Sequence, residues 1–130
     1  MSTDLFLTWD QEPPGLEYVE LAPLLEHAED LTEITNRLNL TSIYDFVSAS
    51  LEEQEEVRAD YDEDDADEFF PLVDEAWFEP AQGIAWIDAL IPALKQSKLE
   101  AREELSVILA ELRAVFTAAR SGRWHFTIPS

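Results

Sequence analysis

The sequence predicts a helix-rich α+β fold with three or four helices and a small two-stranded sheet formed by the two ends of the chain. Apolar residues recur at helical spacing over residues 21–38, 80–94 and 99–120. They alternate as in a strand over residues 5–9 and 123–129. A chain of 130 residues with 46% hydrophobic content is long and apolar enough to form one core. We therefore expect a single domain over residues 1–130.

The two predicted strands lie at opposite ends of the sequence. In "LFLTW", Leu5, Leu7 and Trp9 fall on one face, and the prolines and glycine of "DQEPPG" end the strand. In "RWHFTIP", the apolar positions alternate with His125 and Thr127. A two-stranded ribbon is marginal in water by itself, so we expect helices to pack against it.

The helices are predicted from their apolar stripes and their ends. Thr41 or Ser42 is a suitable cap for a short helix over the sequence "IYDFV". Pro80 suits the first turn of the next helix, in which Gly83 is a weak helix former. Pro92 lacks an amide donor, so we expect a kink or an early end there. The clearest stripe belongs to residues 99–120 and is formed by Leu105, Ile108, Leu109, Leu112, Val115, Phe116 and Ala119.

The net charge of −21 is unevenly distributed along the chain. Residues 1–94 contain 25 acidic and 2 basic residues, a net charge of −23, whereas residues 95–130 carry a net charge of +2. A field of this sign repels nucleic acids and anionic membranes and attracts basic proteins. We expect no direct binding of nucleic acid or membrane. Adaptation to a salty cytoplasm would also explain the acidity.

Residues 60–80 combine acidic and aromatic side chains. Five acids within residues 60–65 repel one another, so we expect a solvated acidic loop at about residues 59–68. The aromatic residues at positions 69, 70, 77 and 78 either anchor the next helix in the core, which we favour for each one, or add contact area beside the acids. The candidate binding residues are Asp60, Tyr61, Asp62, Glu63, Asp64, Asp65, Asp67, Glu68, Trp77 and Phe78.

The acidic cluster does not have the pattern of a calcium-binding loop. Placing Asp60 at position 1 puts Asp62 and Asp64 at positions 3 and 5, but Asp65 replaces the glycine at position 6 and Pro71 the closing glutamate at position 12. The lack of cysteine excludes disulfides and thiolate metal sites. We expect neither a specific metal site nor a cofactor.

Enzyme signatures are largely absent from the sequence. It contains no GxGxxG, P-loop, GxSxG or HExxH motif. His27, beside Glu26, is expected at the surface. His125 could work as an acid or base with a neighbouring carboxylate, so a small enzyme or ligand-binding domain built on it remains an alternative. We expect the protein not to be an enzyme.

Three segments carry a loose resemblance: "LTSIYDFVS" (residues 40–48), "WFEPAQGIAWIDALIPAL" (77–94) and "ELRAVFTAARSGRWHFTI" (111–128). Together they resemble a pattern in small uncharacterised acidic bacterial proteins, which have no assigned function. The resemblance implies no activity. In size and acidity, but not in motif, the chain is also similar to bacterial immunity proteins, which neutralise basic toxins, and to DNA-mimic inhibitors.

The function we expect is therefore a non-enzymatic interaction or inhibitory role, like that of an immunity protein, in which residues 60–68 bind a basic protein partner. A DNA-mimic inhibitor is a further alternative and would need carboxylates at phosphate-like spacing along an extended face. The first 15 residues lack a signal-peptide pattern, and "IDALIPAL" is too short to span a bilayer. We expect a cytoplasmic protein.

Overall fold

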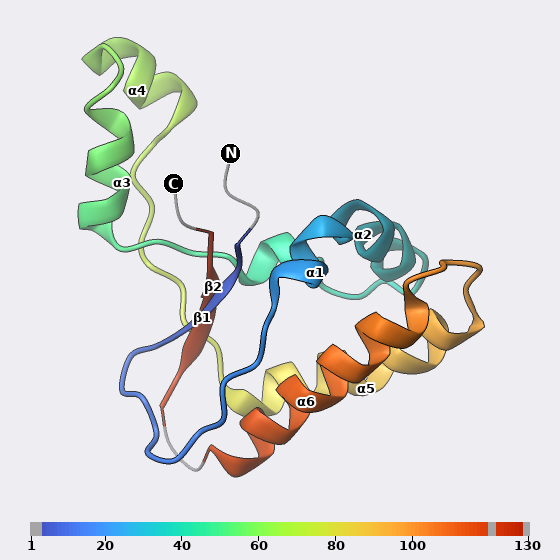
Figure 1. Ribbon diagram of the computed structural model, residues 1–130. Coiled ribbons are helices and arrows are strands. Elements are labelled where there is room, and N and C mark those ends of the chain that lie inside the picture. The colour runs from blue at the N-terminus through green and yellow to red at the C-terminus, as the bar shows by residue number, and fades with distance from the viewer. Residues whose placement is uncertain (1–3, 120–121, 129–130) are drawn as a thin grey trace.

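A two-stranded antiparallel sheet joins segments from opposite ends of the chain, as predicted. In the computed structural model, which describes residues 4–119 and 122–128, β1 (Phe6–Trp9) pairs with β2 (Trp124–Thr127). The register aligns Phe6 with Thr127 and Trp9 with Trp124. Figure 1 shows the sheet at the centre of the molecule, with helices beside it.

Six α-helices and one short 3₁₀ helix occur in the described part of the chain, more than the three or four predicted. They are α1 (Ala22–Glu26), α2 (Ala28–Arg37), η1 (Ile43–Phe46), α3 (Leu51–Arg58), α4 (Glu63–Phe69), α5 (Pro80–Gln96) and α6 (Arg102–Ala118). None of the helices in these described segments has the length and apolar character needed to cross a bilayer.

The predicted helix over residues 21–38 is divided at His27. This residue ends α1 and precedes α2, and its backbone angles, φ −107° and ψ 20°, are not helical. The apolar stripe continues on both sides, with Leu24 and Leu31 fully buried. Because the spacing of apolar residues does not change across the break, the sequence pattern does not reveal it.

Side-chain caps start the helices between residues 42 and 53. Ser42 begins η1 with a capping box formed with Asp45, as the sequence predicts for one of the two candidate residues. Ser50 begins α3 in the same way with Glu53, whose backbone N–H donates to the Ser50 hydroxyl at 3.1 Å. This second cap makes α3 a separate helix rather than an extension of η1.

Helices α5 and α6 lie side by side (Figure 1) and contribute eight of the 18 buried core residues in the described chain. A Cβ atom added to Gly83 would overlap Cε2 of Phe116, so the absence of a side chain allows the close approach of the two helices. Of the two alternatives expected at Pro92, a kink or an early end, the early end is wrong, because α5 continues to Gln96. Leu90 and Leu94, on either side of the proline, are fully buried, and this packing outweighs the missing backbone hydrogen bond.

Residues 48–76, which contain α3 and α4, form an arm that stands away from the rest of the molecule, which we call the body (Figure 1). The two ends of the arm meet on the body. The backbone N–H of Ala76 donates to the Ser48 hydroxyl at 2.8 Å, and Ser48 N–H donates to the carbonyl oxygen of Phe126 in β2 at 3.0 Å. The arm therefore leaves and re-enters the body at one point beside β2.

We predict that Gly83→Ala lowers the free energy of unfolding by about 1–3 kcal/mol, since the new methyl group must displace the buried Phe116 ring. At an unhindered helical position the same change would raise it by about 1 kcal/mol, so the sign is diagnostic. Urea denaturation measures the effect. The penalty should shrink in a Phe116→Leu background. A stabilised Gly83→Ala variant would contradict this account of the helix packing.

Asp10 gives a prediction for pH dependence. The pKa of its carboxyl group is lowered mainly by a hydrogen bond from the Arg123 backbone N–H, at 2.6 Å, and further by the Arg123 side chain. Because its native pKa is lowered, Asp10 stabilises the fold at pH values above its ordinary pKa of 3.8. This stabilisation is lost as the pH falls through the native pKa. The stability difference between wild type and Asp10→Asn should therefore be constant at neutral pH and diminish in acid, as measured by urea titrations. A constant difference down to pH ~2 would contradict it.

Candidate functional site

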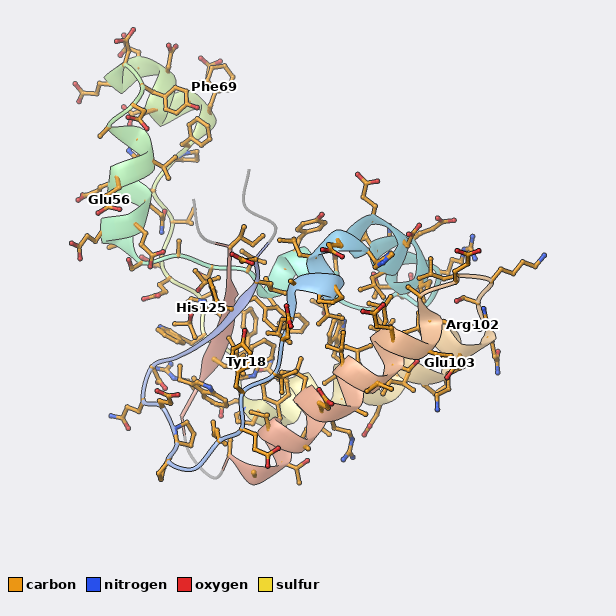
Figure 2. All side chains as sticks on the ribbon, viewed as in Figure 1. Tyr18, Glu56, Phe69, Arg102, Glu103 and His125 are labelled. Carbon is orange, nitrogen blue, oxygen red and sulfur yellow. The ribbon has the colours of Figure 1, made fainter. Side chains whose placement is uncertain are left out.

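The arm has almost no buried side chains. No residue of α3 is buried, and Ala66 is the one buried residue of α4. Large apolar side chains are instead exposed, at 50% for Tyr61, 66% for Phe69 and 60% for Val73. Figure 2 shows Phe69 near the far end of the arm, away from the body. Others exposed on the arm are Leu51, Val57, Phe70 and Leu72.

The expected acidic loop over residues 59–68 is largely helical, so that expectation is wrong. A turn at residues 59–62 leads into α4. Glu63, Asp64 and Asp65 lie in its first turn, where their negative charges interact favourably with the positive end of the helix dipole. Repulsion among these acids argued for a loop, but the helix N-terminus offsets part of it.

Arg58 connects the two helices of the arm. Its Nη1 donates to the carbonyl oxygens of Ala66, at 3.1 Å, and Phe70, at 2.6 Å, while Nη2 pairs with Asp67. The Ala66 carbonyl also accepts from Phe70 N–H at 2.8 Å, so Arg58 gives it a second donor, and Arg58 is a donor to the Phe70 carbonyl just past the end of the helix. Its side chain is 17% exposed, well below the other residues of α3 that bear charge. This one cation therefore stabilises the C-terminal end of α4.

Gln54 connects α3 to residues 70–76, the irregular segment that returns from α4. Its Oε1 accepts from Val73 N–H at 3.0 Å, and its Nε2 donates to the carbonyl oxygens of Val73, at 2.9 Å, and Ala49, at 3.0 Å. The amide thus pairs with the backbone of residue 73 as a neighbouring strand would. Polar side chains, rather than an apolar core, keep the arm folded.

The acidic residues predicted as a binding site all lie on the arm and are exposed. They occupy the turn and α4, where seven carboxylates accompany Tyr61. The interpretation of Phe69 and Phe70 as core residues is wrong, since their exposed fractions are 66% and 39%. These two rings therefore belong to the same exposed surface as the acids. The predicted residues brought together here are Asp60, Tyr61, Asp62, Glu63, Asp64, Asp65, Asp67 and Glu68.

The structure places Trp77 and Phe78 apart from these acids, where the arm joins the body. Both side chains are half-buried. The ring of Phe78 lies 4.9 Å from that of Phe46 and 5.7 Å from that of Trp124, measured between centroids. Its backbone also pairs with Trp124 of β2. Phe78 thus anchors the chain to the core, as expected of an aromatic residue ahead of a helix.

His125 is buried beneath Trp77. Its Nε2 lies 2.9 Å from Oε2 of Glu75, and its Nδ1 lies 3.1 Å from the carbonyl oxygen of Phe126. The Trp77 ring covers it at a centroid distance of 4.5 Å. This arrangement attaches the end of the arm to β2, and both ring nitrogens are engaged in it.

No metal site is found in the described residues, and five clefts there are lined without histidine. Across residues 4–119 and 122–128, no three carboxylates or histidines converge to hold a metal ion. Five clefts in the same ranges have linings that do not include His125. The geometry of His125 is that of a structural contact between the arm and β2.

A cleft between the arm and β2 was not predicted. Val57, Val73 and Ile128, from three separate segments, contribute to its lining. The sequence "LEEQEEVR" has only two apolar residues and no helical stripe, so it gives no sign of a wall in α3. A usable signal was that the segment "LEEQEEVR", which follows the capping residue Ser50, has no apolar stripe, while the nearby segment "FFPLV" has several apolar residues that cannot all reach the core.

Comparison with protein-family models, curated proteins and solved structures gives no match for this chain. Its function must therefore be inferred from its own residues. The two features available for this inference are the exposed acidic and apolar surface of the arm, and the cleft at its base.

We predict that Arg58→Met loosens α4 without unfolding the body. Loss of charge-assisted hydrogen bonds, worth about 1.5–3 kcal/mol, should speed amide hydrogen exchange over residues 63–70 by roughly tenfold or more. Mass spectrometry of peptide fragments measures this. Arg37→Gln is the control, because the Arg37–Glu33 pair is on the surface of α2. Unchanged exchange in the arm of Arg58→Met would contradict the role assigned to Arg58.

Proposed function

We propose that this protein is a non-enzymatic interaction protein, of the inhibitory, immunity-like kind, whose arm binds a basic protein partner. The observation that carries the proposal is the arm itself. Its 29 residues contain 13 acids and one base, a net charge of −12, together with seven exposed large apolar side chains. Acids steer a cationic partner toward this surface, and the apolar residues supply area to bury on contact.

The distribution of acids supports a functional surface over general adaptation to salt. The arm is 29 residues long and contains 13 acidic residues, so nearly half of its residues are acidic. In the remaining 101 residues, 16 are acidic. An environmental cause would enrich acids over the whole surface. Concentration on the projecting part of the molecule favours binding there.

Exposed apolar residues support a protein partner and distinguish the arm from a pure mimic of DNA. A phosphate backbone is copied by carboxylates alone, whereas Phe69 and Val73 would add only unfavourable contact with water. Rings of this size are typical of the residues that contribute most to protein–protein binding. The buried position of His125, with both nitrogens engaged, favours a structural role and gives no support to catalysis by it.

Removing charge from the arm tests the proposal. The variant Asp60→Asn, Asp62→Asn, Asp64→Asn and Asp65→Asn should weaken partner binding by about 1–4 kcal/mol, or more than fivefold in Kd, and reduce its salt dependence. These four residues are exposed, and none makes a salt bridge among the described residues. Partners are isolated by affinity capture at several salt concentrations, and their affinities are then measured with purified proteins.

The matched control removes four exposed acids from the body: Glu17→Gln, Glu20→Gln, Glu26→Gln and Glu29→Gln. It has the same net charge as the arm variant and should keep most of the affinity. Equal losses in both variants, or no salt-sensitive partner at all, would contradict the proposal. A captured partner that duplex DNA displaces would favour the DNA-mimic alternative.

A further inference from the structure

A cleft of about 640 Å³ lies at the base of the arm. One face of α3 and residues 70–76 form its walls, and residues 47–49 with Thr127 and Ile128 form its floor. Sites that accept a drug-sized ligand have volumes of about 300–1,000 Å³. The cleft is therefore large enough to receive a small group of side chains from another molecule.

Hydrogen bonds fix the walls of the cleft in place. Gln54, on one wall, bonds both backbone groups of Val73 on the other. At the floor, the Ser48 hydroxyl accepts from Ala76 N–H, and Ser48 N–H donates to β2. These contacts join all three segments of the lining. A preformed cleft of this kind loses less conformational freedom on binding than one that must first open.

The lining of the cleft combines apolar and acidic side chains. Val47, Val57, Phe70, Val73 and Ile128 contribute the apolar side chains. The acidic residues of the lining are Glu53, Glu56 and Asp74, and none of the lining residues is Lys, Arg or His. Glu53 is already bonded to Ser50 in the cap of α3.

Glu56 and Asp74 are the carboxylates available to a ligand. Both are exposed, and neither forms a salt bridge within the described ranges. They come from different walls of the cleft, α3 and the irregular segment of residues 70–76. A ligand with positive charge on both sides of an apolar centre matches this arrangement.

We infer that the cleft receives a short segment of the basic partner, in which one or two aliphatic or aromatic side chains enter the cleft and flanking Lys or Arg residues pair with Glu56 and Asp74. The inference rests on the proposed function and assigns its specificity to the cleft. A second copy of this chain is a poor occupant, because an arm of net charge −12 would meet a molecule of net charge −21.

A model peptide tests the cleft directly. Fluorescently labelled acetyl-KKLFKK-amide carries an apolar centre between cations, and acetyl-KKGSKK-amide carries the same charge without that centre. Fluorescence anisotropy should show the first peptide binding at least fivefold more tightly than the second. In methyl NMR spectra, the signals of Val57, Val73 and Ile128 should shift with the first peptide, whereas those of Val107 on α6, which is exposed and outside the cleft, should not.

Paired substitutions separate the cleft from the general acidity of the arm. Val57→Ser should weaken binding of acetyl-KKLFKK-amide about fivefold, while Val107→Ser, at an exposed position of α6 outside both the arm and the cleft lining, should leave it unchanged. Glu56→Gln should weaken it about two- to fivefold, while Glu55→Gln, which removes the same charge one residue away from the lining, should have a smaller effect. Circular dichroism verifies that each variant remains folded.

The outcomes separate the two proposals. If both peptides bind equally, or if each variant matches its control, the cleft is not the recognition site, although the arm still attracts cations as the proposed function requires. If neither peptide binds at millimolar concentration, the inference about the cleft is overturned, while the proposed function is judged separately by the charge-removal experiment. If the arm variant and its body control behave alike there, the proposed function fails as well.

Discussion

Burial of Trp124 connects the parts of this molecule. Its ring lies 4.5–5.7 Å, between centroids, from the rings of Phe46, Phe78, Phe116 and Phe126, which come from η1, the segment before α5, α6 and β2. Its indole N–H donates to the carbonyl oxygen of residue 79 at 2.9 Å, just where α5 begins. A buried N–H without a partner would cost about 1–3 kcal/mol, so this bond also fixes the start of α5. The sheet, the helix pair and the returning end of the arm thus meet at one side chain.

The arm is stabilised in a different way from the body. The body buries apolar side chains such as Leu109 and Ile87 completely, whereas the arm depends on Arg58, Gln54 and helix caps, with most of its apolar side chains in water. Helices as short as α3 and α4 are marginal without tertiary packing. Binding elements are commonly found among the less stable parts of a structure. Both the modest stability of the arm and its exposed rings are consistent with a surface that becomes buried on association.

The sequence predicted the body well and the arm poorly. The alternation in "LFLTW" and "RWHFTIP" and the stripe that includes Leu105 and Phe116 correctly indicate the sheet and α6, because the burial of alternate or helically spaced residues leaves a periodic pattern. The arm has no such pattern, since few of its residues are buried. What organises it is a single arginine and a single glutamine acting across 8–19 positions of sequence, and pair interactions of this kind leave no periodic trace. The exposed position of Phe69 has the same cause, because the composition of a segment does not tell which ring reaches the core.

The hydrogen bond between Ala76 and Ser48 beside β2 bears on how the sequence of this protein can change. Both ends of the arm are attached to the same strand, and its helices share few contacts with the helices of the body. The arm is topologically an insertion, so its length and sequence can change while the connections of the body remain as they are. The same body could therefore carry a different arm. Under the function we propose, replacing the arm would change the partner that is recognised while the body keeps its fold.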